Sequence, residues 1–268
     1  VRGVVGEVVD LVRVDFAVGF PPLQNASIAS GIPREQNIAA CETVIAGFRC
    51  PSTLTPQNML DASAYNPPWY VARRVPCSYI ACASGLVQND FRPAPNGTGV
   101  PFWEMDGAIV PRSNPNNWVT PRPERGQTRS GFDNIRFAQI TDGLSNTILV
   151  GEAEAQTVLE TTQENPNGGR KDHWAIGGDD MDSYEGIDWS ELAGSTGVRM
   201  NLRQPLPTAS QEELSAYEVS FGSRHPGGAN FLMGDGSVRF VKETIDLRTY
   251  SALGTRNRGE VVSADAAN

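Results

Sequence analysis

A single segment, residues 221–240, limits what this chain can fold into. Residues 231–233 and residues 238–240 each alternate in the manner of a β-strand, and Asp235-Gly236 lies between them. An Asp-Gly pair between two alternating runs is among the strongest local signals for a β-hairpin, because the turn needs a residue with positive φ. The segment therefore predicts a hairpin near the C-terminal end, to which the other strands of a sheet must pair.

His225 precedes Asp235 by ten positions. We expect His225 to hydrogen-bond either to backbone or to Asp235 and so to orient the hairpin. The alternative is a hydrolytic set in which His225 and Asp235 act with Ser223 or Ser237. These serines lack the Gly-x-Ser-x-Gly turn that exposes a nucleophile, and the hairpin turn already explains Asp235. The sequence therefore favours a structural motif of His225, Asp235 and Gly236 and predicts no catalytic residue.

The bulk properties indicate a folded, acidic protein. The 268 residues include 22 Lys and Arg against 31 Asp and Glu, which gives a net charge of −9. A protein that binds nucleic acid needs clustered positive charge, so we expect no nucleic-acid partner. No apolar run approaches the length that spans a bilayer. We expect one globular domain over residues 1–268, with a long loop excursion at about 90–131 where Pro, Gly and Asn concentrate.

Short strand-like runs separated by turns indicate the fold class. Residues 77–86 and 147–150 are strand candidates besides the hairpin, and residues 242–253 form the last helical candidate. The 27 Gly and 19 Pro residues point to many turns. The pattern predicts an α+β fold that is rich in loops, with a mostly antiparallel sheet and few helices.

Four cysteines lie in the first third of the chain, and their even number makes them disulfide candidates with three possible connectivities. They are Cys41, Cys50, Cys77 and Cys82. Four buried thiols are the alternative. None of the spacings is Cys-x-x-Cys, which disfavours a zinc site or a thioredoxin-like redox site.

Segment 177–188 concentrates carboxylates, the ligands that Ca²⁺ prefers in a flexible loop. The spacing is not that of an EF-hand, and a solvated acidic surface loop is the alternative reading. The candidate calcium ligands are Asp179, Asp180, Asp182, Glu185 and Asp188. A transition-metal site of His173 with Asp172 and Asp179 is less favoured, and we expect no other cofactor.

Aromatic side chains offer a second binding feature, because their faces stack on sugars, although tryptophan is more often a core residue. The candidates for such a carbohydrate platform are Trp69, Trp103, Trp118, Trp174 and Trp189, with Tyr184. Asp142 and Asn146 have a different expected role. Both residue types cap turns and helix N–H groups, and we expect that role here.

The pattern of His225, nine residues and Asp235-Gly236 is similar to the C-terminal signature of a large family of planctomycete surface proteins. That family carries prepilin-type N-termini, is of unknown function and is also labelled solute-binding-like. Other segments resemble it in the same order along the chain. They are Phe48–Ser52 with Cys-Pro-Ser, Ser78–Cys82 with Ser-Tyr, Ile140–Glu152 with Thr-Asp-Gly-x-Ser-Asn-Thr, and residues 253–256 followed by Gly259-Glu260.

The resemblance implies a non-enzymatic, exported structural or interaction protein. It would be the globular head of a pilin-like or pseudopilin-like subunit, located outside the cell or in the cell envelope, where disulfides are favoured. It would act through surface loops by self-association or by assembly with other pilin-like subunits into a filament. The methylation motif and long apolar helix of that family do not appear in this sequence, so membrane contact is expected only through that missing helix. A solute- or glycan-binding module is the alternative, and a hydrolase using His225 is less favoured.

Overall fold

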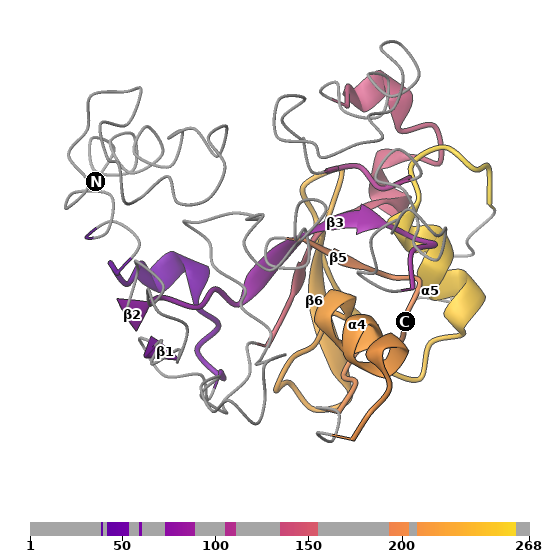
Figure 1. The fold of residues 1–268 in the computed structure, drawn as a ribbon. Helices are drawn as coiled ribbons and strands as arrows, with labels where there is room; N and C mark the ends of the chain where they lie inside the picture. Colours follow the sequence, from indigo (N-terminus) through magenta and orange to yellow (C-terminus); the bar gives the residue numbers. More distant parts are fainter. Residues whose placement is uncertain are drawn as a thin grey trace, which may run out of the picture.

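The structure is a computed structural model, and it describes residues 39, 42–53, 59–60, 73–88, 105–110, 135–154, 193–203 and 208–260. Its main element is one five-stranded sheet (Figure 1). The strands of this sheet are β3 (Tyr79–Ser84), β4 (Ile148–Glu152), β5 (Ala193–Ser195), β6 (Gly228–Met233) and β7 (Val238–Lys242). A separate two-stranded sheet pairs β1 (Met59–Leu60) with β2 (Arg73–Arg74).

The five strands lie in the order β5-β3-β4-β6-β7. The pairs β3–β4, β4–β6 and β6–β7 are antiparallel, and β5 alone runs parallel to its neighbour β3. With this mostly antiparallel sheet and few helices, the described residues confirm the predicted α+β class. The predicted strands at 77–86 and 147–150 are confirmed as β3 and β4.

The predicted hairpin is formed by β6 and β7, which pair in register from Gly228 opposite Lys242 to Leu232 opposite Val238. At the turn, the Gly236 N–H donates to the Met233 carbonyl at 3.0 Å. Gly236 has φ +86°, a conformation that a side chain would strain. The local signal in the sequence was therefore sufficient to place this hairpin.

Two α-helices have their ends in the described residues, and a side chain caps the start of each. In α4 (Gln211–Val219), the Ser210 hydroxyl accepts from the Glu213 N–H, and the Glu213 carboxylate accepts from the Ser210 N–H. In α5 (Leu247–Gly254), the Asp246 carboxylate accepts from the backbone N–H groups of Arg248 and Thr249. Short 3₁₀ turns are η1 (Ala46–Phe48), η3 (Phe137–Gln139) and η4 (Leu144–Asn146). Within the described residues, no helix is long and apolar enough to cross a membrane.

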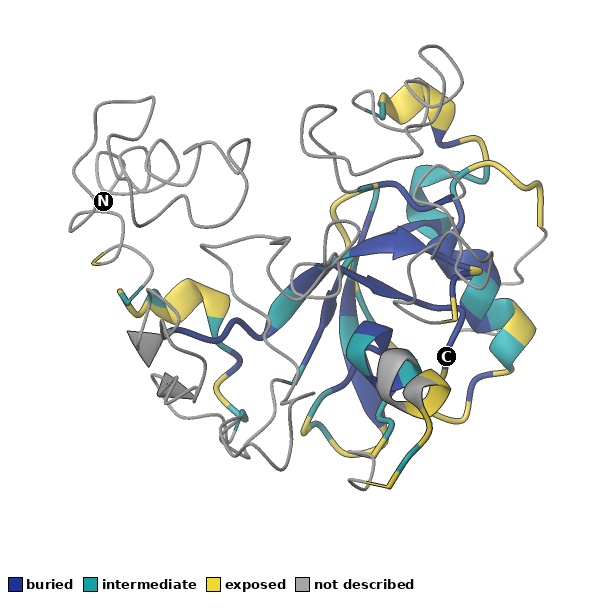
Figure 2. Cartoon of the chain, in the orientation of Figure 1, coloured by how far each residue is buried: buried dark blue, intermediate teal, exposed yellow. Residues whose placement is uncertain are grey.

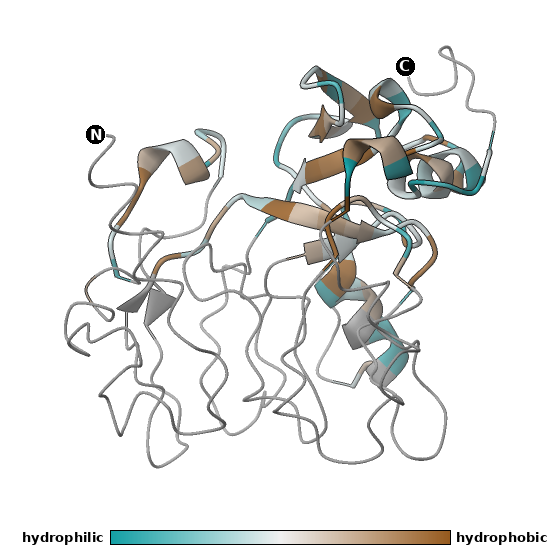
Figure 3. Ribbon diagram, turned by 90° about the horizontal axis from the view of Figure 1, so that it is seen from above, coloured by the Kyte–Doolittle hydropathy of each residue, from teal (hydrophilic) through white to brown (hydrophobic). Residues whose placement is uncertain are grey.

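Helix α5 packs against β3 and β4, and α4 packs against β5. The inner strands are mostly buried (Figure 2), whereas β7 is largely exposed. Hydrophobic residues recur along the strands of the sheet, and hydrophilic residues are interspersed along the helices and loops (Figure 3). Three aromatic rings form the centre of the core: Phe221 meets Phe231 edge-on at 5.3 Å between ring centroids, and Phe231 meets Tyr250 at 5.9 Å. Edge-to-face pairs at such distances add to the stabilisation that burial gives.

The cysteines in the described residues are buried thiols: Cys50, Cys77 and Cys82. Complete burial raises the pKa of the Cys82 thiol from 9.0 to about 12, and the nearby Asp106 carboxylate adds to this rise. Cys41 lies outside the described residues, so the predicted disulfide pairing of the four cysteines stays a prediction.

Candidate functional site

Three segments that are far apart in the sequence meet beside the start of β6. The Nε2 atom of His225 lies 3.2 Å from Glu152 Oε1 and 3.5 Å from Cys50 Sγ. The Ser52 hydroxyl also lies 3.5 Å from this nitrogen, and 2.9 Å from Cys50 Sγ. The ligand atoms of Cys50, Glu152 and His225 all lie within 4.8 Å of one another. We call Cys50, Ser52, Glu152 and His225 the His225 cluster.

Hydrogen bonds hold the Cys50 segment against the start of β3. The Ser78 N–H donates to the Phe48 carbonyl at 2.8 Å, and the Arg49 guanidinium donates to the Pro76 carbonyl at 3.2 Å. The Thr53 N–H then closes a turn on the Cys50 carbonyl at 3.1 Å. This turn brings the Cys50 thiol and the Ser52 hydroxyl to the same side.

Glu152 is the last residue of β4, and its side chain is buried. Its Oε2 atom accepts from the Asn230 backbone N–H at 2.7 Å and from the Asn230 side-chain amide at 3.2 Å. The carboxylate is therefore fixed by the neighbouring strand β6, and Oε1 is left to face His225. On the neighbouring strand β3, Tyr79 lies directly opposite Glu152. Burial raises the pKa of the Tyr79 phenol, and the charges of Cys50, Glu152 and Cys77 add to that rise.

His225 lies in the loop that enters β6, and its backbone N–H donates to the Ser223 hydroxyl at 3.2 Å. The structure does not join His225 to Asp235, because the six residues of β6, about 20 Å of strand, separate the two ends of the motif. Asp235 accepts instead from the Ser237 N–H at 2.9 Å and from the Ser237 hydroxyl at 2.7 Å. These bonds lower the pKa of the Asp235 carboxyl. Of the two partners expected for His225, Asp235 is therefore not one, and the Asp235 carboxylate bonds within the hairpin turn.

The geometry of the His225 cluster differs from that of a nucleophile–base–acid relay. In a relay, one ring nitrogen faces the nucleophile and the other faces the carboxylate. Here Cys50 and Glu152 both approach Nε2. The alternative set of His225 and Asp235 with Ser223 or Ser237 is not assembled either, because Ser237 bonds to Asp235 in the distant turn. What the cluster offers instead is a thiol, a carboxylate and an imidazole directed at one point.

A shallow hollow of about 10 Å³, with room for about one water molecule, lies beside this cluster. Its lining includes Cys50, Ser52 and Glu152, and Arg224 and Glu154 form an ion pair at its edge. Sites for small organic ligands usually enclose about 300–1,000 Å³. The hollow therefore suits an ion or water better than a solute.

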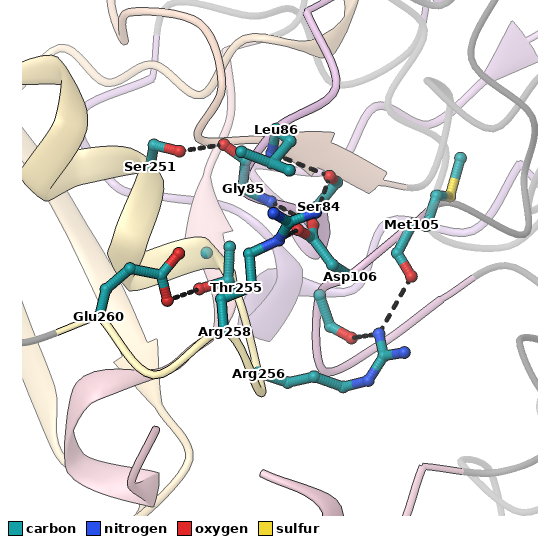
Figure 4. Close-up of polar contacts among 12 residues, drawn as sticks. Ser84, Gly85, Leu86, Met105, Asp106, Ser251, Thr255, Arg256, Arg258 and Glu260 are labelled. Carbon is teal, nitrogen blue, oxygen red and sulfur yellow. Dashed lines mark hydrogen bonds and ion pairs between the residues drawn. The ribbon is translucent and has the colours of Figure 1, made fainter. Parts of the chain in front are cut away.

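A second polar cluster ties the C-terminal loop to the sheet (Figure 4). Asp106 accepts from the Ser84 hydroxyl at 2.7 Å and from the Arg258 guanidinium at 2.7 Å. The Arg256 guanidinium donates to two backbone carbonyls of the loop around Asp106, those of Met105 and Gly107. All of these are fixed, partly buried contacts between segments, which gives this cluster a structural role.

Asp142 caps backbone N–H groups as expected, but the groups belong to a distant segment. Its carboxylate accepts from the Arg258 N–H at 2.9 Å and from the Gly259 N–H at 2.7 Å. The Asn146 amide donates to the Asp142 carbonyl at 3.3 Å and so holds the local turn. The expected local cap is thus in part a long-range connection to the C-terminal loop.

Several predicted site residues lie outside the described residues. These are the calcium candidates Asp179, Asp180, Asp182, Glu185 and Asp188, the residues His173 and Asp172, the aromatic platform Trp69, Trp103, Trp118, Trp174, Trp189 and Tyr184, and Cys41. Sequence reasoning did not assign Glu152 to any site, although it ends the segment Ile140–Glu152. It also treated Cys50 only as a disulfide candidate, because nothing local links it to His225.

Comparisons with known proteins agree with the resemblance at the level of the family. A family model described as "Protein of unknown function (DUF1559)" matches residues 22–248, and it also carries a label of the bacterial solute-binding-protein type. No significant match was found among the curated proteins or among the solved structures. The matched range includes the whole His225 cluster and the hairpin. The chain belongs to this family of unknown function.

Proposed function

We propose that this chain is an exported, non-enzymatic surface protein that acts by assembly, as the globular head of a pilin-like or pseudopilin-like subunit of the planctomycete type. The observation that carries the proposal is the outer edge of the sheet. In the described residues β7 is the last strand of the sheet, so one side of its backbone is free to pair with another chain. Free sheet edges are templates for strand addition and self-association.

The side chains of β7 give this edge strand an exposed apolar face. Val238 is 67 % exposed and Phe240 is 39 % exposed, and both lie on the same face of the strand. Natural edge strands usually carry charged or proline residues that prevent pairing. Strand β7 carries two such charges, Arg239 and Lys242, but the exposed apolar pair Val238 and Phe240 supports a surface that is covered in an assembly.

The chemistry of the described residues supports a role in binding rather than catalysis. The His225 cluster lacks the relay geometry of a hydrolase, because Cys50 and Glu152 approach the same nitrogen. The solute- or glycan-binding alternative has the support of the family label. The hollow in the described residues is small for a solute, and the tryptophans of that hypothesis lie outside those residues. The label also supports an extracellular or periplasmic location.

Sedimentation velocity over a concentration series tests the proposal. We expect the average mass of the wild-type chain to rise with concentration, and Val238→Asp to suppress this rise by placing a charge at the edge. The matched control is Phe137→Asp, because Phe137 is 66 % exposed but lies in η3 rather than in the sheet. A wild-type chain that stays monomeric at every concentration, or a Val238→Asp variant that associates as the wild type does, contradicts assembly through β7.

A further inference from the structure

We propose that Cys50, Glu152 and His225 bind one divalent metal ion of the zinc class. The three side chains come from the turn after η1, the end of β4 and the loop before β6. Their ligand atoms, one sulfur, one carboxylate oxygen and one imidazole nitrogen, lie within 4.8 Å of one another. This proposal does not depend on assembly through β7.

Two of the three distances between the ligand atoms match the edges of a tetrahedron around zinc. With Zn–S, Zn–N and Zn–O bonds of about 2.3, 2.05 and 2.1 Å, tetrahedral angles place sulfur and nitrogen about 3.6 Å apart and nitrogen and oxygen about 3.4 Å apart. The structure has 3.5 Å between Cys50 Sγ and His225 Nε2, and 3.2 Å between His225 Nε2 and Glu152 Oε1. Both distances lie within about 0.2 Å of those expected for ligands of one zinc ion, and Cys50 Sγ lies within 4.8 Å of the Glu152 carboxylate.

Hydrogen bonding alone accounts poorly for this arrangement. An imidazole nitrogen carries either one hydrogen or one lone pair, so it makes a single in-plane hydrogen bond. Three polar atoms surround His225 Nε2, namely Glu152 Oε1 at 3.2 Å, Cys50 Sγ at 3.5 Å and Ser52 Oγ at 3.5 Å. A metal ion at the centre uses the nitrogen, sulfur and carboxylate together, and a water or the Ser52 hydroxyl completes the fourth position.

The surroundings of the cluster are those of a metal site. Metal-bound carboxylates are usually held by further hydrogen bonds, and Asn230 holds Glu152 through Oε2 while Oε1 faces the cluster. Cys50 and Glu152 are buried, and His225 is partly exposed. The partly exposed His225 side chain is the point at which an ion reaches the cluster from solvent.

The ligand types select the class of metal. Sulfur and imidazole suit Zn²⁺ and its neighbours in the first transition row, whereas Ca²⁺ and Mg²⁺ prefer sites made of oxygen alone. Binding needs the Cys50 thiolate and a neutral His225, so the thiol proton leaves to solvent as the metal–sulfur bond forms. A metal-bound Cys50 is also unavailable for the disulfide that its sequence context predicts.

Such an ion would stabilise the fold as well. It would join positions 50, 152 and 225, which only tertiary structure brings together. A ligand that binds the folded chain and not the unfolded chain raises the melting temperature. We therefore expect Zn²⁺ to raise the melting temperature of the wild type more than that of Cys50→Ser.

The test uses the full chain, purified with a phosphine reductant, stripped with a chelator and titrated with Zn²⁺ against a competing indicator. We expect one ion per chain. Cys50→Ser and His225→Ala should each weaken binding at least about 100-fold, since losing only an outer partner costs about 10- to 100-fold. The matched control is Cys77→Ser, which removes another buried thiol that is not part of the cluster. Circular dichroism checks that each variant is folded.

Co²⁺ substitution gives a spectroscopic readout that does not rely on affinity. We expect a sulfur-to-cobalt charge-transfer band in the wild type and in Cys77→Ser, and its loss in Cys50→Ser. Asn230→Ala, which removes one bond to Glu152, should bind Zn²⁺ about 10-fold more weakly and keep the band. The proposal is overturned if the wild type binds no Zn²⁺ under competition, or if folded Cys50→Ser binds it as tightly as the wild type does.

Discussion

The Nε atom of Arg258 donates a hydrogen bond to Oδ2 of Asp106 at 2.7 Å and joins two positions that are 152 residues apart. The other carboxylate oxygen accepts from the Ser84 hydroxyl and from the Gly85 N–H at 3.0 Å. One buried carboxylate thus connects the end of β3, the loop around Asp106 and the C-terminal loop. We expect this residue to be one of the main determinants of stability.

Replacing this carboxylate tests that role. Asp106→Asn keeps the shape of the side chain but removes the charge that three donors share, and it should lower the free energy of unfolding by about 1–3 kcal/mol. Arg258→Gln should cost less than about 1 kcal/mol, because the Arg258 side chain is 47 % exposed and solvent screens its charge. Urea denaturation of both variants measures the difference. Equal costs would show that the ion pair, and not the buried carboxylate, carries the connection.

Gly107 gives a second prediction, because its backbone is pressed against β3. A Cβ atom there would lie 2.4 Å from the backbone carbon of Ala83 and 2.6 Å from the Cys82 carbonyl oxygen. Gly107→Ala should therefore force a backbone shift and lower the free energy of unfolding by about 1–3 kcal/mol. Gly47→Ala is the matched control, since nothing lies within 4 Å of its added Cβ, and it should change stability by less than about 0.5 kcal/mol. Similar unfolding midpoints for the two variants would contradict the close packing at Gly107.

The buried thiol of Cys82 predicts a specific dependence of stability on pH. Its pKa rises from 9.0 to about 12 on folding, so above pH 9 the unfolded chain loses a proton that the folded chain keeps. Stability is then lost as pH rises from 9 towards 12. This thiol should remove about 1 kcal/mol of stability between about pH 8 and about pH 10.

Cys82→Ala isolates this contribution from those of other groups. The variant lacks the thiol, so its stability should fall by about 1 kcal/mol less than that of the wild type over the same pH range. Denaturant titrations of both proteins at the two pH values give the comparison. Parallel losses would mean that the Cys82 thiol titrates at its ordinary pKa in the folded chain.

The elements with local signals were predictable. The turn residues and the alternation of residues 221–240 indicated the hairpin, and the strand-like runs indicated β3 and β4. Helix α4 was missed, although Ser210 followed by Glu213 is a capping-box signal, because its apolar residues do not form a clear stripe. Strand β5 was missed because Ala-Gly-Ser has low strand propensity, and this segment is a strand only through its pairing with β3.

The candidate site was not predictable in the same way. Cys50 and His225 are 175 positions apart, and their meeting depends on how the Cys50 turn is tied to β3 and how β6 is placed beside β4. Zinc was disfavoured on the spacing of the cysteines, and that criterion applies only to ligands that share one segment. Asp235 had a complete local explanation in its turn, and that is the role the structure gives it.

Site-specific photo-cross-linking tests assembly through β7 most directly. A photoreactive residue placed at Val238 should link the chain to β7 of a second copy or to another surface subunit, and mass spectrometry identifies the linked peptides. The same residue at Arg248, which is exposed on α5, serves as the control and should give few intermolecular links. The proposed function is contradicted if position 238 gives only links within one chain, or if it gives no more intermolecular links than the Arg248 control does.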